Sequence, residues 1–433
     1  MNSPCDLLIK NCTILPMNSK NFIENGSIAV KNSKIAFVGK NPLEAEACKE
    51  IDGRGMVALP GLVNCHTHVP MTLFRGVADE KPLRDWLRKS IWPLEAKLKA
   101  EDVYLGALLG CLEMIKSGTT CFGDMYFFED AVARAVEESG LRGVLAEGII
   151  EAENRELGEE MLSASVAFAE RFNGKADGRI TAMLGPHAAY SCSPELLCRV
   201  KEEAARLKVG VHIHLAESEA LFRELQRHKA SEVEFLDEIG FLDARVVAAH
   251  CINLSANDKR ILSKRGVNMV YVPVANMKLG LGVAETAALA EAGVNVGLGT
   301  DGAASNNVLD MFETIKFASL FQKGFCGNPT VLPAYDVLRM ATLDGAKALG
   351  LGGQVGSLEV GKKADIILVD FSKPHLKPLH NVYSALVYSA KCNDVDTVIV
   401  DGKVLMENRH VKTLDEQAVM AKAEKAAYDL AKR

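Results

Sequence analysis

The chain has 433 residues, of which 48% are hydrophobic, and a formal net charge of −6 at pH 7. A chain of this length and composition can bury a large core, enough for one α/β barrel and a smaller domain. The acidic balance and the lack of a basic run exclude a non-specific nucleic-acid-binding protein, and no stretch approaches the roughly 18 apolar residues of a membrane span.

The eleven cysteines are scattered and odd in number, and no two of them form a CxxC pair. Such spacing is typical of a reducing compartment rather than of a disulfide framework or a Cys-based zinc site. The N-terminal sequence MNSPCDLLIK lacks the charged and apolar regions of a secretory signal. We therefore expect a cytoplasmic protein with no membrane partner.

Both ends of the chain are rich in short strand-like segments. Near the N-terminus these are CDLLIKNCTILP and SIAVKNSKIAFVG, and near the C-terminus they are GSLEVGKKADIILVD and VDTVIVDGKVLM. This pattern predicts a small β-sandwich domain formed by residues 1–58 and 356–412. The Ala- and Lys-rich segment 413–433 predicts a final amphipathic helix.

Strand-like and helix-like segments alternate between residues 59 and 355. The eight candidate strands are MVALPGLVNCHTH, TTCFGDM, RGVLAEGII, ITAMLGPH, GVHIHLAE, RVVAAHC, VNMVYVP and VNVGLGTD. Eight such units predict an α/β fold with a (β/α)8 TIM barrel. An open doubly wound sheet is the alternative, but no Gly-rich phosphate-binding motif follows an early strand.

Catalytic groups of such barrels lie at the C-terminal ends of the strands. Seven of the eight candidate strands end in ionisable or metal-binding residues. In chain order these residues are His66 and His68, Asp124, Glu147, His187, His214 with Glu217, His250, and Asp301. The sequence therefore predicts an active site at this end of the barrel.

Three histidines and an aspartate predict a metal site. His66 and His68 are two residues apart and therefore share one face of their strand. With His214 and Asp301 they supply the His and carboxylate ligands of a catalytic metal site. We expect a divalent metal ion, zinc in the first place, with iron or manganese as alternatives. His212 shares the face of His214 but should lie one layer deeper, as a core or supporting residue. The histidines outside strand ends, expected on the surface or in structural positions, are His228, His375, His380 and His410.

The motifs PGLVNCHTH, GPH, HIHLAE, AAHC and GTDG, in this order, resemble those of the amidohydrolase superfamily of metal-dependent hydrolases. The resemblance covers nearly the whole chain. Members with two metal ions carry a lysine at the end of the fourth strand, where this chain has His187 in GPHAAY. The resemblance therefore implies a single ion and the deaminase-like branch.

Three loop segments resemble the 5'-methylthioadenosine/S-adenosylhomocysteine deaminases, a group that includes relatives acting on 5'-deoxyadenosine. The segments are HTHVPMTLFRGVADEKPLRDWL, IWPLEAKL and TDGAASNNVLDMFETIK. The resemblance implies hydrolytic deamination of 5'-deoxyadenosine or 5'-methylthioadenosine to the inosine analogue plus ammonia, in salvage of S-adenosylmethionine by-products. S-adenosylhomocysteine and adenosine are further candidate substrates.

The strand-end residues suggest how such a reaction proceeds. A divalent ion lowers the pKa of its bound water, and Asp301 can both bind the ion and accept a proton from that water. His250 can orient or deprotonate the nucleophile. Glu217 can protonate a ring nitrogen and then the leaving amine. A solvated carboxylate that opens the next helix is the alternative interpretation of Glu217.

By resemblance, Glu95 binds the 2'- and 3'-hydroxyls of the ribose, and His187 contacts the substrate near the sugar. A helix-surface glutamate paired with Lys99 is the alternative for Glu95, and a supporting group behind the metal is the alternative for His187. The expected metal ligands are His66, His68, His214 and Asp301; the expected catalytic residues are Glu217, His250 and Asp301; the expected substrate contacts are Glu95, His187, His214, Glu217 and Asp301.

One position departs from the family pattern. Many bacterial members carry an arginine near the end of the third strand that suits the homocysteine carboxylate, and this chain has Glu147 there. Two carboxylates repel each other, and Arg142 lies at the start of that strand, so it cannot replace the arginine. We therefore expect small uncharged 5' groups to be favoured over S-adenosylhomocysteine.

Two other functions remain open from the sequence. A guanine, cytosine or s-triazine aminohydrolase would keep the fold, although a free base offers no ribose to Glu95. A metal-free binding or scaffold barrel would lack activity. Related barrels commonly assemble, so we expect a homo-oligomer, either a dimer or a tetramer.

Overall fold

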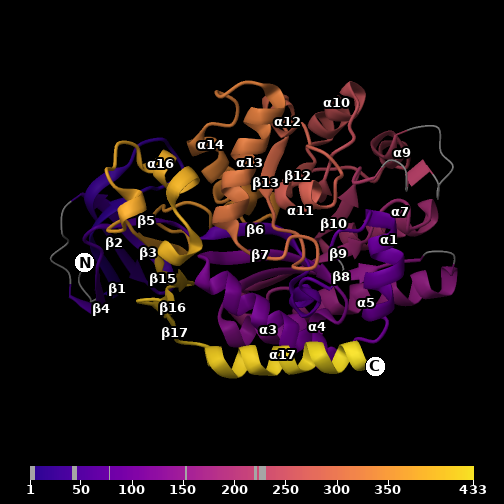
Figure 1. Cartoon of the computed structure of the whole chain (residues 1–433), viewed down its shortest axis with the longest axis horizontal. Helices are drawn as coiled ribbons and strands as arrows, with labels where there is room; N and C mark the ends of the chain where they lie inside the picture. The colour runs from indigo at the N-terminus through magenta and orange to yellow at the C-terminus, as the bar shows by residue number, and fades with distance from the viewer. Residues whose placement is uncertain (1–4, 41–45, 78, 152–153, 219–221, 224–230) are drawn as a thin grey trace.

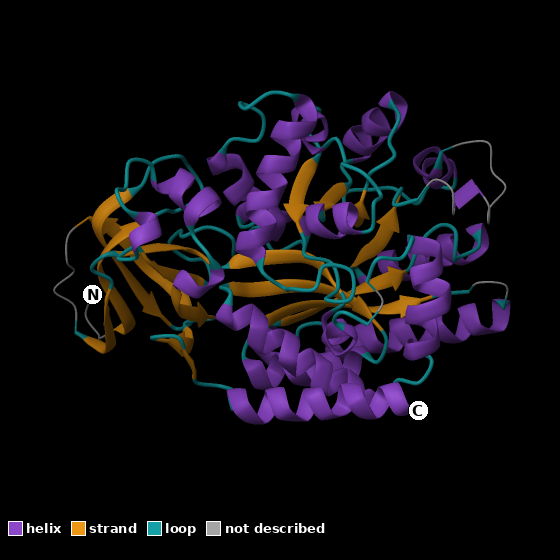
Figure 2. Cartoon of the chain, in the orientation of Figure 1, coloured by secondary structure: helices purple, strands orange, loops and turns teal. Residues whose placement is uncertain are grey.

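The computed structural model describes residues 5–40, 46–77, 79–151, 154–218, 222–223 and 231–433. Its strands form two sheets, one at the end of the molecule that holds the N-terminus and one at the centre of a ring of helices (Figures 1 and 2). The predicted α/β fold class is confirmed. No helix in these residues has the length and apolar character needed to cross a membrane.

The central sheet contains the eight predicted barrel strands, and each is parallel to its neighbours. In sheet order they are β6 (Leu62–Thr67), β7 (Thr119–Tyr126), β8 (Arg142–Ile149), β9 (Ile180–Pro186), β10 (Gly210–Leu215), β11 (Val246–His250), β12 (Asn268–Tyr271) and β13 (Asn295–Leu298). Their residues are almost all buried, as expected for strands covered on both faces. Just beyond β13, the Asp301 N–H donates to the His66 carbonyl at 2.9 Å and joins the last strand to the first.

Helices follow most of the strands and cover the outside of the barrel (Figure 2). They are α3 (Ala100–Lys116), α4 (Glu129–Ser139), α5 (Arg155–Phe172), α6 (Lys175–Gly178), α7 (Pro194–Leu207), α9 (Glu232–Glu238), α10 (Ala256–Arg265), α11 (Pro273–Lys278), α12 (Thr286–Glu291), α13 (Met311–Cys326), α14 (Ala334–Met340) and α15 (Leu343–Ala348). Several begin at a capping side chain that accepts a backbone N–H of the first turn, as Ser193, Ser231 and Ser255 do.

An extra helical segment lies between β6 and α3. It contains the 3₁₀ helix η1 (Val69–Phe74), α1 (Leu83–Trp86), the π-helical turn η2 (Leu87–Ile91) and α2 (Trp92–Glu95). Its apolar residues Leu83, Trp86, Leu87 and Ile91 follow helical spacing, and all four are buried. This segment covers the C-terminal mouth of the barrel.

The second sheet combines strands from both ends of the chain, in the order β17-β16-β15-β14-β5-β1-β2-β3, with β4 also paired to β1. They are β1 (Cys5–Ile14), β2 (Ile23–Lys31), β3 (Lys34–Lys40), β4 (Ala47–Asp52), β5 (Met56–Pro60), β14 (Ile366–Asp370), β15 (Val395–Val400), β16 (Lys403–Glu407) and β17 (His410–Val411). The antiparallel pairing of β5 with β14 joins the two halves. The domain boundaries 1–58, 59–355 and 356–412 stay a prediction.

The connection between β14 and β15 contains short helices, and the chain then ends in a long one. The short elements are η3 (Pro374–Leu376), α16 (Val382–Ser384), η4 (Ala385–Ser389) and η5 (Cys392–Asp394). The final helix α17 (Glu416–Lys432) lies along α3 on the outside of the barrel (Figure 1). Its buried residues recur at helical spacing and face α3, as the amphipathic pattern predicts; they are Val419, Ala423, Ala426 and Leu430.

A buried ion pair joins the barrel to the sheet of the termini. Arg142, at the start of β8, is 1% exposed, and its Nε and Nη2 donate to the two carboxylate oxygens of Asp365 at 2.9 and 3.1 Å. The same carboxylate accepts the backbone N–H of Asp401 at 2.8 Å. This bidentate pair lies at the N-terminal end of the barrel strands. Arg142 therefore cannot take part in a site at their C-terminal ends.

We expect Asp365→Ala to lower the free energy of unfolding by about 3–5 kcal/mol, because it removes the bidentate partner of the buried Arg142 charge and leaves only the Asp401 carboxylate at 3.8 Å. Denaturant unfolding followed by circular dichroism measures this change. The control is Asp130→Ala, which breaks an ion pair with Arg171 whose side chains are 49% and 66% exposed and should change stability by less than about 1 kcal/mol. Equal effects of the two substitutions would contradict the structural role of the buried pair.

Candidate active site and metal centre

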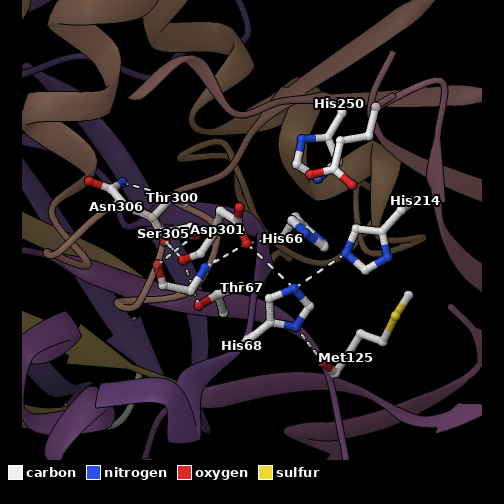
Figure 3. Close-up of polar contacts among 12 residues, drawn as sticks. His66, Thr67, His68, Met125, His214, His250, Thr300, Asp301, Ser305 and Asn306 are labelled. Atoms are coloured by element: carbon white, nitrogen blue, oxygen red, sulfur yellow. Dashed lines mark hydrogen bonds and ion pairs between the residues drawn. The ribbon is translucent and has the colours of Figure 1, made fainter. Parts of the chain in front are cut away.

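Three imidazole rings meet at the C-terminal mouth of the barrel. His66 and His68 come from the end of β6, and His214 comes from β10 (Figure 3). One ring nitrogen of each lies within 4.8 Å of the others, and the Nε2 atoms of His68 and His214 are 3.3 Å apart. The predicted convergence of strands one and five is therefore present.

Backbone carbonyls orient two of these rings. Nδ1 of His68 donates to the Met125 carbonyl at 2.6 Å, and Nδ1 of His214 donates to the His187 carbonyl at 2.8 Å. Because a carbonyl can only accept, each Nδ1 carries the proton and each Nε2 keeps a lone pair directed at the other rings. Nδ1 of His66 instead meets Nε2 of His212 at 2.9 Å, so His212 lies one layer deeper, as predicted.

The donor set fits a divalent metal ion. Nε2 of His66 is buried and has no hydrogen-bond partner in the described structure. Burial lowers the pKa of the His66 and His214 rings, so both are neutral, the form in which imidazole binds metal. Three neutral imidazoles with converging lone pairs beside a carboxylate are typical of such a site.

The carboxylate beside these rings is that of Asp301. Its Oδ1 lies 3.4 Å from Nε2 of His68 and 3.7 Å from Nε2 of His66. The residue has a left-handed backbone (φ +65°), and its Oδ1 accepts the Gly302 N–H at 2.6 Å. A left-handed conformation is unusual outside glycine, and such strain is concentrated at functional sites. Here it directs the carboxylate back toward the histidines.

His250 and Glu217 lie together beside the three rings. Nε2 of His250 is 3.7 Å from Oε1 of Glu217, and the His250 ring stacks with that of His214 at a centroid distance of 5.5 Å. Glu217 is 8% exposed, and burial raises the pKa of its carboxyl group against the opposing effect of His250. A carboxyl group with a raised pKa can hold and donate a proton near neutral pH.

A pocket opens above this cluster, with the covering segment as its apolar wall. Its lining residues are His68, Met71, Leu83, Trp86, Leu87, Ile91, Trp92, Glu95, Met125, Tyr126, Phe127, Gly148, Ile150, His187, Tyr190, His214, Glu217, His250, Leu279 and Asp301. An apolar pocket with a few converging polar groups is typical of small-molecule sites. No lysine or arginine occurs among these described lining residues. The predicted residues His68, Glu95, His187, His214, Glu217, His250 and Asp301 all line the pocket, and His66 lies beneath them.

Glu95 lines the pocket from the end of α2 in the covering segment, and His187 lines it from the residue directly after β9. Glu95 is half-buried, and burial raises the pKa of its carboxyl group to about 7, with Tyr126 acting in the opposite direction. Burial lowers the pKa of His187 to about 3, so its ring is neutral, and its Nδ1 lies 3.0 Å from the Ser191 hydroxyl. His187 also orients His214 through its carbonyl, a role that its side chain alone would not indicate.

The structure corrects the predicted position of Glu147. Its carboxylate accepts the backbone N–H groups of Phe128 at 3.0 Å and Glu129 at 2.7 Å, at the start of α4, and it does not line the pocket. Glu147 therefore does not face the substrate as we expected. Asp124 is also outside the lining, because its Oδ1 accepts the Val69 N–H at 2.7 Å.

The remaining predicted surface or structural histidines lie away from the pocket. Nε2 of His375 pairs with Asp394 at 2.7 Å, and Nδ1 of His410 contacts the Asn408 carbonyl at 2.9 Å. His380 is exposed, and His228 lies outside the described residues.

The apolar residues of the pocket wall were not predicted individually. The helical spacing of Leu, Trp and Ile in LRDWLRKSI could have indicated them, because it places these side chains on one face of a helix.

Comparisons with known proteins find relatives that match nearly the whole chain. The 5'-deoxyadenosine deaminase of Methanosarcina acetivorans is 53% identical over 430 residues, 99% of each chain. The 5-methylthioadenosine/S-adenosylhomocysteine deaminase of Thermoanaerobacter pseudethanolicus is 48% identical over 99% of this chain and 100% of its own. The crystal structure of an adenosine deaminase from Xanthomonas campestris with bound zinc matches with a TM-score of 0.95 and 34% identity over 100% of both chains.

The same relationship appears at the level of the family. The profile described as "Amidohydrolase family" matches residues 57–405, which include every barrel strand from β6 to β13. Together with full-length relatives of about half-identical sequence, this match shows that the chain belongs to the amidohydrolase family.

Proposed function

We propose that this chain is a hydrolase that deaminates adenosine-type nucleosides with small 5' groups, giving the inosine analogue and ammonia. The observation that carries this proposal is that three features meet in one apolar pocket: the histidine cluster, the buried Glu217 carboxyl group with its raised pKa, and the Glu95 carboxyl group. The names of the full-length relatives support the same reaction. 5'-Deoxyadenosine and 5'-methylthioadenosine are the preferred substrates, in salvage of S-adenosylmethionine by-products.

We infer that His66, His68, His214 and Asp301 hold one divalent ion, with zinc ahead of iron and manganese. The converging Nε2 atoms and the buried Nε2 of His66 support these ligands, and the lack of a lysine at the end of β9 supports a single ion. When bound, the ion supplies a water molecule of lowered pKa as the nucleophile.

The side chains around the ion manage the protons of the reaction. His250 and Asp301 accept protons from the attacking water and hold it in position. Glu217 donates a proton to a ring nitrogen, which makes the amidine carbon electrophilic, and then carries a proton to the leaving amino group. Water and the nucleoside are consumed, and the C–N bond to the amine is broken. The raised pKa of Glu217 suits this donor role.

Glu95 and His187 bind the sugar in this arrangement. One ionised carboxylate can accept hydrogen bonds from two vicinal hydroxyls, which matches the 2'- and 3'-hydroxyls of ribose. The lining described above offers no cation to the carboxylate of S-adenosylhomocysteine. Small uncharged 5' groups therefore remain favoured, because the described lining is largely apolar and holds no cation, rather than because of Glu147.

Free-base or triazine aminohydrolysis is the alternative with the same fold, and comparing turnover of adenosine with that of adenine separates the two. An inactive scaffold is the alternative of another class, and metal analysis of purified protein decides it. We also infer a homo-oligomer, dimer or tetramer, from the assembly of related barrels. We also infer a cytoplasmic location, because the eleven cysteines are free and free thiols are typical of a reducing compartment.

We expect one equivalent of divalent metal per chain, because a single set of three histidines and one aspartate surrounds the site. His66→Ala and His214→Ala should each lose the ion and the activity together, as measured by elemental analysis and ammonia release. The control is His410→Ala, an exposed histidine that should keep both. Two equivalents in active enzyme, or inactive variants with full metal content, would refute the ligand assignment.

We expect Glu217→Gln to keep the metal and substrate binding but to lower kcat by a factor on the order of 10²–10⁴, the usual contribution of positioned proton transfer. Steady-state kinetics with 5'-deoxyadenosine measure kcat, and the dissociation constant of the product 5'-deoxyinosine measures binding. A near-normal kcat would show that another group protonates the ring.

We expect Glu95→Ala to lower kcat/KM for ribose-containing substrates by at least about tenfold, because hydrogen bonds to a charged group contribute roughly 1.5–3 kcal/mol each. A 2',3'-dideoxy substrate never makes those bonds and should lose little. Equal losses on both substrates would return Glu95 to a structural role.

The raised pKa of Glu95 adds a pH test of the same contact. Burial raises this pKa to about 7, so the carboxyl group becomes neutral as the pH falls through about 7 and then accepts hydrogen bonds less well. The ratio of kcat/KM for the ribose substrate to that for its dideoxy analogue should fall over this range. In Glu95→Gln this ratio should not change with pH, because the amide side chain does not titrate.

A further inference from the structure

Asn276, on α11 after β12, is a buried residue in contact with His250. It is 1% exposed, and its Oδ1 lies 2.8 Å from Nδ1 of His250. Its Nδ2 is buried without a hydrogen-bond partner in the described structure. A buried amide that uses only one of its two polar ends is costly, so the end that it uses should have a function.

We propose that Asn276 is a positioning residue that holds His250 in the tautomer with the proton on Nδ1 and the lone pair on Nε2. This inference rests on the proposed function, in which His250 accepts a proton from the attacking water. An amide oxygen can only accept, so the contact at 2.8 Å requires a proton on Nδ1 of His250. Nε2 is then the only ring nitrogen that can accept a proton.

The other neighbours of the His250 ring do not fix its tautomer. His250 ends β11 in a left-handed conformation (φ +74°), and its Nε2 faces the Glu217 carboxyl group at 3.7 Å. The rings of His66 and His214 lie 5.6 and 5.5 Å away, measured between centroids. Of these described neighbours, only Asn276 contacts Nδ1 at hydrogen-bonding distance. Without it, the ring can rotate or take the other tautomer and present an N–H to the water.

The backbone holds Asn276 itself in place. The α11 helix begins directly after β12, the Asn276 N–H donates to the Val272 carbonyl at 3.2 Å, and the Asn276 carbonyl accepts the Leu281 N–H at 2.9 Å. Hydrogen bonds of its own backbone thus fix Asn276 between the exit of β12 and the residues that follow α11. The side chain reaches His250, at the end of β11, from the helix that follows the neighbouring strand β12.

The activity test uses three variants in the zinc-loaded enzyme. Asn276→Leu removes the acceptor at similar volume, and kcat for 5'-deoxyadenosine should fall on the order of 10²-fold with KM and zinc content nearly unchanged. Asn276→Asp keeps the shape and the acceptor oxygens but has no N–H, so it should recover most of kcat. An aspartate variant as slow as the leucine variant would overturn the proposal, because it would mean that the amide N–H is the group that matters.

Asn268, the first residue of β12, offers a matched control. It is 8% exposed, and its Nδ2 donates to the Ala244 carbonyl at 3.0 Å while its Oδ1 accepts from Asn295 at 3.0 Å. Asn268→Leu should lower the melting temperature at least as much as Asn276→Leu and leave kcat unchanged. If the two leucine variants lose kcat equally, or if Asn276→Leu keeps full kcat, the positioning role is refuted.

A spectroscopic measurement tests the tautomer without relying on turnover. The ring nitrogens of histidine-labelled, zinc-loaded enzyme are observed by ¹⁵N NMR, with His250 identified by its absence in His250→Gln. We expect Nδ1 to be protonated and Nε2 to be unprotonated, and we expect this state to be lost in Asn276→Leu. A proton on Nε2 of the unaltered enzyme would overturn the inference. If the unaltered enzyme turns over no adenosine-type nucleoside, the proposed function fails and this measurement still decides the tautomer.

Discussion

The hydrogen bond between the Asp301 N–H and the His66 carbonyl is the contact on which the rest of the site depends. At 2.9 Å it joins the exit of the last barrel strand to the end of the first. A barrel closes only when its first and last strands meet, and here they meet at two of the proposed metal ligands. The same backbone contact thus completes the fold and brings the Asp301 carboxylate to 3.7 Å from the His66 ring. A loss of closure would therefore also separate the proposed ligands, so the geometry of the proposed metal site depends on the closed barrel.

Around this contact, backbone carbonyls and neutral side chains set the state of each functional ring. Carbonyls of Met125 and His187 hold His68 and His214, and Asn276 contacts His250. A carboxylate in place of either backbone carbonyl would favour the imidazolium form of His68 or His214, which cannot bind a metal ion. The neutral surroundings therefore agree with the chemistry that the site must perform. They also come from strands adjacent to those that carry the rings, so the barrel itself supplies the supporting groups.

Much of this arrangement was predictable from the sequence, because strand periodicity and position determine which side chains reach the mouth of a parallel barrel. His66, His68, His214 and Asp301 follow from that rule alone. Glu147 does not, since it occupies a strand end yet binds the Phe128 and Glu129 N–H groups at the start of α4. A carboxylate near a helix N-terminus can bind the free N–H groups of the first turn instead of pointing into the pocket. The position of a residue at a strand end does not predict which of the two it does. Asn276 was equally hidden, because nothing in PVANMK distinguishes it from an ordinary helix residue until its distance to His250 is known.

Glu147 is one of three neighbouring carboxyl groups near the pocket that accept backbone N–H groups. Glu129 is fully buried and accepts the Tyr126 N–H at 3.0 Å, while the buried Asp124 accepts the Val69 N–H at 2.7 Å. Burial raises the pKa of all three carboxyl groups, so the cluster can be accommodated in protonated form despite having no cation in these contacts. Glu129 and Glu147 bind N–H groups at the end of β7 and at the start of α4, and Asp124 binds the start of η1. The end of β7 carries both the Met125 carbonyl that holds His68 and the Tyr126 side chain that interacts with Glu95. The proposed metal side and the proposed sugar side of the pocket are thus connected through the end of β7, which these carboxyl groups hold in place by backbone hydrogen bonds.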